Sequence, residues 1–367
     1  MKTKKLLVVL TALMLVLAAC SSDDGSDTTE GGTDATEAPS GGGDGGSLLA
    51  EVMDRGELKC GTRDALTGFA VLTADGDHVG FDSDFCRAIA AALLGDAEAV
   101  DHVDLETSDR FTALQSGQID VLVRNTTWTA SRDGSEGATF LATTFYDGQG
   151  MMVSADSGFA GIEDMDGVIV CVAKGTTTEG NAAATADRLG LEWEVRPFDD
   201  NDLIQEAFGA GQCDGWSADF GALVGIRGDQ PDGPESVLLL PEVFSKEPLG
   251  PAVLDGNDEL AQAVNWVVFA TIQAEEWGIT TANVDDFLDS EDSNIRKFLG
   301  ATFTDGDGNE TTLDAGLGLP ADFAYQVIKQ VGNYGEIFDR HLTPLGLERG
   351  VNALWFDGGL LYAPPYR

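Results

Sequence analysis

Two segments that lie 94 residues apart follow the same pattern, and this repeat restricts the fold more than any other feature of the chain. Residues 113–120 read Ala-Leu-Gln-Ser-Gly-Gln-Ile-Asp, and residues 207–214 read Ala-Phe-Gly-Ala-Gly-Gln-Cys-Asp. Each copy joins a short amphipathic helix to an apolar strand through a Gly-Gln turn. Upstream of each copy, a strand carries a cysteine and leads to Gly-Thr, at 59–62 and 170–176. The repeat therefore predicts two similar α/β lobes.

Strands and helices alternate within each copy, which predicts a mostly parallel sheet flanked by helices in each lobe. The first lobe is expected to contain strands at 57–61, 100–105 and 119–123 and helices at 82–94 and 110–115. The second is expected to contain strands at 168–172, 191–195 and 213–217 and helices at 177–189, 201–208 and 220–226. A further helix at 260–276 reads as core packing.

Two extended segments with Gly or Pro, at 147–153 and 245–253, lie where the chain must pass between the lobes. Two such crossings form a hinge. The first lobe is therefore predicted to consist of residues 48–147 and 250–367, and the second of residues 151–245.

The first 47 residues precede these lobes and have a different character. Residues 1–19 read as an export signal, because three lysines precede a twelve-residue apolar run that is shorter than the ~20 residues of a membrane-spanning helix. Leu-Ala-Ala then leads to Cys20, which resembles the lipobox of bacterial lipoproteins and implies that Cys20 carries a lipid anchor. A plain secretory signal with an incidental cysteine is the alternative. Residues 21–47 hold seven acids and no base, which predicts a flexible, acidic tether.

The four remaining cysteines are Cys60, Cys86, Cys171 and Cys213. In an oxidising compartment they can pair in three ways, among which sequence alone cannot choose. The two-lobe repeat favours Cys60 with Cys86 and Cys171 with Cys213, one bridge in each lobe, and each bridge would add ~3 kcal/mol of stability. Four buried free thiols are the alternative.

The chain carries 63 acidic and 21 basic residues, a formal net charge of −42. A nucleic-acid-binding protein is excluded, because its affinity requires a basic face. Three histidines leave little material for a zinc site or a catalytic triad, and neither a metal nor a cofactor is expected. The calcium-like residues 305–309 read as a polar loop, since the glycine and glutamate that such a loop needs are absent, and residues 199–202 read as a helix cap.

A ligand site is expected in the cleft between the lobes, at the carboxyl ends of the strands. In the second lobe, Thr176 and Thr177 begin a helix whose free amides attract an anion. Asp219 follows another strand there and provides a counter-charge for an ammonium group. Ordinary helix capping is the alternative role for these threonines and for Asp219.

The first lobe contributes residues 124–132, which follow a strand end and include Asn125, Thr127 and Arg132. Arg132 can hold a carboxylate through two parallel hydrogen bonds, and Thr127 adds a donor. A surface ion pair is the alternative role for Arg132.

Longer stretches of sequence with distinctive motifs are spread over essentially all of residues 48–367. They are Gly-Phe-Asp-Ser-Asp-Phe-Cys-Arg at 80–87, residues 110–117, 124–132, 146–150, 175–179 and 241–251, Ile-Lys-Gln-Val-Gly-Asn-Tyr-Gly at 328–335, and Tyr-Ala-Pro-Pro-Tyr at 362–366. These blocks resemble the periplasmic binding proteins of polar amino-acid ABC importers, most closely the general L-amino-acid binding proteins.

The resemblance implies a two-lobed α/β fold of the type II periplasmic-binding-protein kind. It also implies a non-enzymatic, extracytoplasmic, lipid-anchored monomer that binds an L-amino acid and delivers it to ABC permease subunits. On this reading, Arg132, Thr127 and the amides of Thr176 and Thr177 hold the α-carboxylate of the ligand. Asp219 holds its α-ammonium group.

The chain departs from the histidine- and lysine-binding relatives at two positions: Arg63 stands where they carry an acid, and Leu66 where they carry an aromatic residue. A specificity that is broader or more tolerant of acidic ligands is therefore expected, with Arg63, Phe69 and Arg110 in the side-chain pocket. A dehydratase-like enzyme on the same fold is the rival function. It would need a cleft acid or base beyond Asp219, which is already assigned to the ammonium group. A sensory ligand-binding domain is a third reading.

Overall fold

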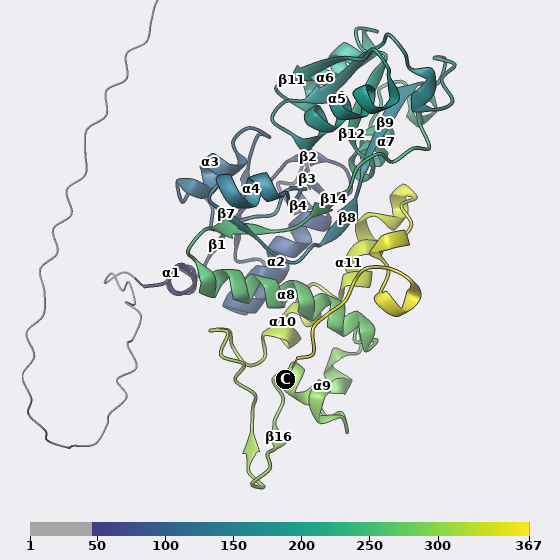
Figure 1. Ribbon diagram of the computed structural model, residues 1–367. Helices are drawn as coiled ribbons and strands as arrows, with labels where there is room; N and C mark the ends of the chain where they lie inside the picture. The colour runs from purple at the N-terminus through teal and green to yellow at the C-terminus, as the bar shows by residue number, and fades with distance from the viewer. Residues whose placement is uncertain (1–45, 367) are drawn as a thin grey trace, which may run out of the picture. The chain divides into compact units, whose positions relative to one another are not determined.

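The computed structural model describes residues 46–366, which fold into two lobes with one five-stranded sheet each (Figure 1). The predicted export signal, Cys20 and nearly all of the tether lie outside the described residues. The strands of the first sheet are β1 (Leu58–Thr62), β5 (Val100–Asp104), β6 (Val121–Leu122), β7 (Ala138–Phe140) and β15 (Ala252–Leu254). Those of the second sheet are β9 (Gln149–Ser154), β10 (Ile169–Ala173), β11 (Glu194–Phe198), β12 (Gly215–Asp219) and β13 (Val237–Leu239).

Helices cover both sheets, and the first lobe also receives the helices of the C-terminal third. The helices of the first lobe are α1 (Leu48–Arg55), α2 (Phe81–Leu94), α3 (Arg110–Gln115), α4 (Ala130–Ser135), α8 (Asp258–Glu276), α9 (Ser293–Phe298), α10 (Phe323–Gln330) and α11 (Tyr334–His341). Those of the second lobe are α5 (Thr177–Leu189), α6 (Asn201–Gly209) and α7 (Phe220–Gly228). No helix in residues 46–366 is long and apolar enough to cross a membrane.

The two sheets share one topology, with strand orders β5-β1-β6-β15-β7 and β11-β10-β12-β9-β13. In each sheet a single strand runs against the other four: β15 in the first and β9 in the second. Both reversed strands directly follow the hinge, a ribbon in which β8 (Phe145–Asp147) pairs with β14 (Glu247–Leu249). The hinge lies near the carboxyl ends of the parallel strands, so a strand that arrives from it must run the opposite way. The sheets are thus mixed and mostly parallel, which confirms the predicted fold class.

Two smaller features complete the first lobe. Strands β2 (Ala65–Leu66), β3 (Ala70–Leu72) and β4 (His78–Val79) form a short antiparallel sheet between β1 and α2. Strands β16 (Phe303–Thr304) and β17 (Glu310–Thr311) form a hairpin. Residues 305–309 form its turn, where the carboxylate of Asp305 accepts hydrogen bonds from the amides of Asp307 and Asn309.

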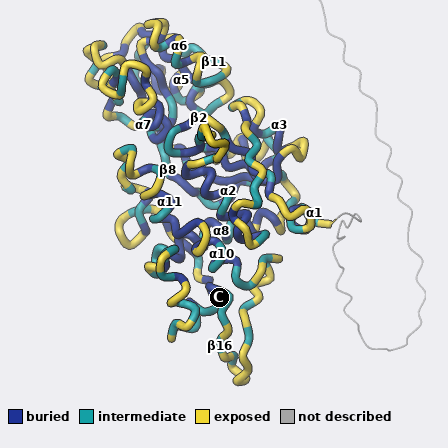
Figure 2. The backbone as a smooth tube through the Cα atoms, turned by 180° about the vertical axis from the view of Figure 1, so that it is seen from behind, coloured by how far each residue is buried: buried dark blue, intermediate teal, exposed yellow. Residues whose placement is uncertain are grey.

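Helix α2 is the centre of the first core, with twelve of its residues buried, because it packs between the sheet and helices α8, α10 and α11 (Figure 2). Edge-to-face aromatic pairs join Phe81 of α2 to Phe145 of the hinge and to Tyr334 of α11. The structure contains both bridges that the repeat favours. Cys60 bonds to Cys86, which ties β1 to α2, and Cys171 bonds to Cys213 in the second lobe.

The C-terminal segment is fastened to the hinge. The side-chain amide of Asn352 donates to the carbonyl oxygen of Tyr146 in β8 (3.0 Å) and accepts from its amide (2.7 Å). The Arg349 guanidinium forms two parallel hydrogen bonds with Glu275 of α8, at 2.9 and 3.0 Å. The last part of the chain therefore braces one of the two crossing strands against the first lobe.

Candidate functional site

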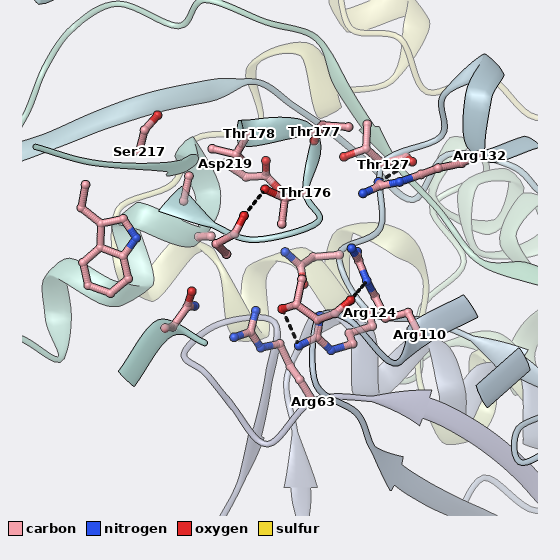
Figure 3. Close-up of a pocket in the computed structure, with 17 residues that line it drawn as sticks. Arg63, Arg110, Arg124, Thr127, Arg132, Thr176, Thr177, Thr178, Ser217 and Asp219 are labelled. Atoms are coloured by element: carbon pink, nitrogen blue, oxygen red, sulfur yellow. Dashed lines mark hydrogen bonds between the residues drawn. The ribbon is translucent and has the colours of Figure 1, made fainter. Parts of the chain in front are cut away.

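A cavity lies between the lobes where the carboxyl ends of both sets of parallel strands meet (Figure 3). Figure 3 shows three arginines gathered on one side of it and the threonines after β10, with Asp219, on the other. The first lobe contributes residues that follow β1, β5 and β6, and the second contributes residues that follow β10 and β12. The predicted location of the ligand site is therefore occupied by a polar cavity.

Arg132 reaches this cavity from the first turn of α4. Thr129 caps the helix, because its hydroxyl accepts a hydrogen bond from the Arg132 amide at 3.2 Å. The Arg132 guanidinium donates to the carbonyl oxygen of Thr127 at 2.9 Å, and its side chain is buried. Arg132 therefore makes no surface ion pair with any acidic residue in 46–366, and its remaining N–H groups are available to a carboxylate.

Three further arginines, which we call the pocket arginines, also line the cavity: Arg63, Arg110 and Arg124. Arg124 donates to the carbonyl oxygen of Leu105 at 2.8 Å, and Arg110 donates to that of Thr107 at 2.9 Å. Burial, together with the positive charges of its arginine neighbours, lowers the pKa of Arg110 to about 9. Burial lowers the pKa of Arg63 as well, and burial with the nearby arginines holds the pKa of Arg124 well below its usual range. The cavity thus concentrates positive charge.

On the second lobe, Thr176 is the N-cap of α5, and its hydroxyl accepts from the Glu179 amide at 3.4 Å. The first amides of a helix have no partner within the helix and attract anions. The Thr177 hydroxyl donates to the carboxylate of Glu247 at 2.9 Å, and Glu247 also accepts from Asn181 at 2.7 Å. Because Glu247 belongs to β14, the hinge itself fixes the start of α5.

Asp219 ends β12 and occupies the N-cap position of α7, yet its side chain makes no capping hydrogen bond. Asp147 of β8 takes that role, because its carboxylate accepts from the Gly221 amide at 3.0 Å. The capping alternative for Asp219 is therefore wrong, and its buried carboxylate is available to a ligand. Burial, and next the charges of Asp147 and Glu247, raise the pKa of Asp219 well above its ordinary value.

The structure brings most of the predicted site residues together. The cavity is lined by Arg63, Arg110, Asn125, Thr127, Arg132, Thr176, Thr177 and Asp219. Phe69 is not among the lining residues, so its assignment to the side-chain pocket is wrong. Its ring packs edge-on against Phe145, with centroids 5.4 Å apart, and against Phe81, which places it in the aromatic core.

Sequence reasoning missed two notable lining residues, Arg124 and Trp216. Trp216 lies in β12, and its pattern is that of a core strand residue, but its buried indole N–H has no hydrogen-bond partner among the described residues.

Asn125 was predicted as a site residue, and the structure adds two details about it. Its backbone has a φ of 27°, which a non-glycine residue rarely adopts, and its buried side-chain oxygen also has no partner there. Unpaired buried polar atoms beside a cavity are consistent with a polar ligand.

The described residues contain no group of three or more His, Cys, Asp or Glu side chains placed to hold a metal ion.

Two named relatives match most of the chain. The general L-amino acid-binding periplasmic protein of Rhizobium johnstonii is 44% identical over 324 residues, which cover 88% of this chain and 93% of the relative. The glutamate/glutamine/aspartate/asparagine-binding protein of Rhodobacter capsulatus is 42% identical over 325 residues, which cover 88% of this chain and 94% of that relative.

Among solved structures, an ABC transporter periplasmic binding protein from Brucella ovis with glutathione bound superposes with a TM-score of 0.83. It is 40% identical, and the match covers 88% of this chain and all of that one. An ancestral arginine-binding protein bound to arginine is 29% identical with a TM-score of 0.52, and 95% of that chain matches only 61% of this one. Residues 58–278 match the family model of bacterial extracellular solute-binding proteins, family 3. The chain therefore belongs to family 3 of the bacterial extracellular solute-binding proteins.

Proposed function

We propose that this protein binds an L-amino acid in the cavity between its lobes and delivers it to the membrane subunits of an ABC importer. The observation that carries the proposal is the separation of charge across the cavity. Arg132 and the free amides at the start of α5 form a carboxylate site, and the buried Asp219 provides an ammonium site without serving as a helix cap. The names of the relatives from Rhizobium johnstonii and Rhodobacter capsulatus support an amino-acid ligand.

Binding rather than catalysis fits the chemistry of these groups. A dehydratase would need an acid or base that is free to exchange a proton with the bound substrate. The carboxylate of Asp219 would instead be paired with the ligand ammonium group. Family membership likewise favours a solute-binding protein over an enzyme.

Ligand capture would proceed by closure of the lobes about the β8–β14 ribbon. In this structure the lobes touch at Thr67, between β2 and β3, whose hydroxyl donates to the carboxylate of Asp229 just after α7 at 2.6 Å. The domain boundaries that accompany this reading are residues 48–147 with 250–367 for one lobe and residues 151–245 for the other. A closed form of this kind is what a permease would distinguish from the open, unloaded form.

The proposed location is the outer face of the cell membrane, where a lipid on Cys20 would hold a monomer. A flexible chain as long as residues 21–47 would have an average end-to-end distance of about 30 Å. The binding lobes would therefore remain close to the membrane and to the permease. Mass spectrometry of the membrane-extracted protein tests this point, since an unmodified Cys20 would exclude the anchor.

The decisive experiment is a calorimetric and thermal-shift screen of residues 46–367 against the L-amino acids, with wild type, Arg132→Ala and Arg188→Ala. Arg188 is an exposed residue near the end of α5 and serves as the control. A micromolar ligand corresponds to about −8 kcal/mol of binding free energy, and loss of one partner of a buried charge pair removes about 2 to 5 kcal/mol. Arg132→Ala should therefore weaken binding by roughly 30- to 5,000-fold, whereas Arg188→Ala should bind normally.

Three outcomes would contradict parts of this proposal. Normal binding by Arg132→Ala would show that the carboxylate site lies elsewhere. Release of a chemically altered product would indicate the enzymatic alternative. No response of the wild-type protein to any amino acid would refute the proposed ligand class.

A further inference from the structure

The cavity contains more positive charge than an amino acid with a neutral side chain can use. The α-carboxylate of such a ligand needs one arginine, which the site provides as Arg132. Three pocket arginines remain, and they come from separate elements: Arg63 follows β1, Arg110 begins α3, and Arg124 follows β6. Figure 3 shows these three side chains gathered on one side of the cavity, opposite Asp219 and apart from Arg132.

None of the four arginines has a carboxylate within 4.0 Å among the described residues. Their hydrogen-bond partners are neutral oxygens. These partners are the carbonyl groups of Leu105, Thr107 and Thr127 and the hydroxyl groups of Thr107 and Thr126. Neutral acceptors orient a guanidinium group but leave its charge uncompensated, which is unfavourable in a buried site.

Two buried carboxylates, Asp82 and Asp219, lie near the pocket arginines, and each already has a role. Asp82 accepts a hydrogen bond from the Asn125 amide at 2.8 Å, and burial raises its pKa to about 6. Asp219 would pair with the ligand ammonium group. Asp64 and Glu106, which also act on Arg63, are exposed and therefore screened by water. A zwitterionic ligand is neutral overall and leaves the excess positive charge in place.

From this arrangement we propose that the cavity selects amino acids that carry a second carboxylate, which the pocket arginines hold by the ligand side chain. This inference rests on the proposed function and narrows it to the acidic amino acids. A side-chain carboxylate adds one negative charge where three guanidinium groups converge, and arginine binds carboxylates through paired N–H groups.

Arg63 is the residue on which this selectivity should depend most. It makes no hydrogen bond in the described part of the chain, and its Nε is buried without a partner. Arg110 and Arg124 each donate at least two hydrogen bonds that hold neighbouring loops in place, so their replacement would also disturb the structure. Replacement of Arg63 removes a charge from the pocket while leaving those loop contacts intact.

The test is isothermal calorimetry of residues 46–367 with two ligand pairs of matched shape, glutamate with glutamine and aspartate with asparagine. We expect the wild-type protein to bind each acid at least about tenfold more tightly than its amide. That difference corresponds to about 1.4 kcal/mol, the lower end of a charge-assisted hydrogen bond. Arg63→Gln should lose at least about tenfold in glutamate affinity and considerably less in glutamine affinity, so that the ratio of the two affinities falls toward one. Arg188→Gln is the control and should retain the wild-type ratio.

The outcomes separate this inference from the function on which it rests. Equal wild-type affinity for glutamate and glutamine would overturn the inference while leaving an amino-acid receptor in place. An equal loss of affinity for glutamate and glutamine in a folded Arg63→Gln variant would also overturn it. Arg63 would then act on the α-amino and α-carboxylate groups that both ligands share. If the wild-type protein bound none of the four ligands and no other amino acid, the proposed function would be refuted instead. If Arg63→Gln does not fold, the wild-type ratios still decide the question.

Discussion

Gly225 lies in α7 of the second lobe, against the first lobe, and its replacement by alanine should hold the lobes apart. A Cβ at this position would stand 2.3 Å from the carbonyl oxygen of Thr67, which is backbone and cannot rotate away. Ordinary contacts of a Cβ begin near 3.4 Å, so α7 and the loop around Thr67 must separate by about 1 Å. The same substitution improves helix propensity by up to ~1 kcal/mol, so the second lobe itself should remain folded.

The expected effect is on closure, and through it on affinity. Overpacking of a well-fitted contact typically costs about 1 to 3 kcal/mol. If the contact around Thr67 exists only in the closed form that holds the ligand, amino-acid affinity should fall by roughly 5- to 150-fold, although Gly225 does not line the cavity. Calorimetry measures this loss, and small-angle X-ray scattering with saturating ligand should show a larger radius of gyration than for the wild type.

Gly228→Ala in the same helix is the matched control, because no atom lies within 4 Å of its added Cβ. It should bind ligand like the wild type and be equally stable or slightly more so in urea. Wild-type affinity and an unchanged scattering profile for Gly225→Ala would refute the claim that this contact belongs to closure.

Two further predictions concern protonation and the bridges. Burial and the charge of Glu247 raise the pKa of Asp147 to about 7. Burial and the charges of Asp147 and Glu247 raise the pKa of Asp219 well above its ordinary value, so the free protein retains a proton that an ammonium ligand must displace. Amino-acid affinity should therefore rise from about pH 6 to about pH 8, by at most tenfold per pH unit. Calorimetry should show the released proton as a binding enthalpy that depends on the buffer. An affinity that does not change with pH would contradict the pairing of Asp219 with the ammonium group. Replacing Cys171 and Cys213 by serine opens a loop of 42 residues and should lower the free energy of unfolding by about 3 to 4 kcal/mol, measured by urea denaturation in comparison with the oxidised wild type. An unchanged free energy of unfolding would contradict a stabilising role for this bridge.

Local signals in the sequence located most elements well. Helix α5 begins and ends where predicted, because Thr176 caps its start and Gly190 ends it with a φ of 70°. Strand β11 was predicted three residues too early. Leu191 belongs to the helix terminus, since its amide donates to the Ala186 carbonyl, and the strand continues beyond its predicted end at residue 195 to include Pro197. Proline is tolerated there because β11 is an edge strand.

The same distinction between local signals and distant contacts applies to the candidate site. Residues whose role follows from a local element, such as Arg132 after a strand end or Thr176 at a helix start, were identified from sequence. Phe69 was misplaced and Trp216 was missed because their environments depend on distant partners. The ring of Phe69 meets an aromatic residue of the hinge, whereas Trp216 borders a cavity that exists only once both lobes are assembled. Arg124 was not identified because no residue near it in the sequence indicates that Arg63 and Arg110 lie close to it in the fold.

The position of β15 sets the order in which the lobes can form. This strand lies between β6 and β7, although more than 100 residues of chain separate it from either neighbour. All five strands of the second sheet lie between residues 149 and 239, so that lobe has its complete set before β15 emerges from the ribosome or the export channel. Until residue 254 is present, the first sheet can exist only as two separate pieces, and the helices that cover α2 arrive later still. The lobe that begins the chain is therefore the last to be completed.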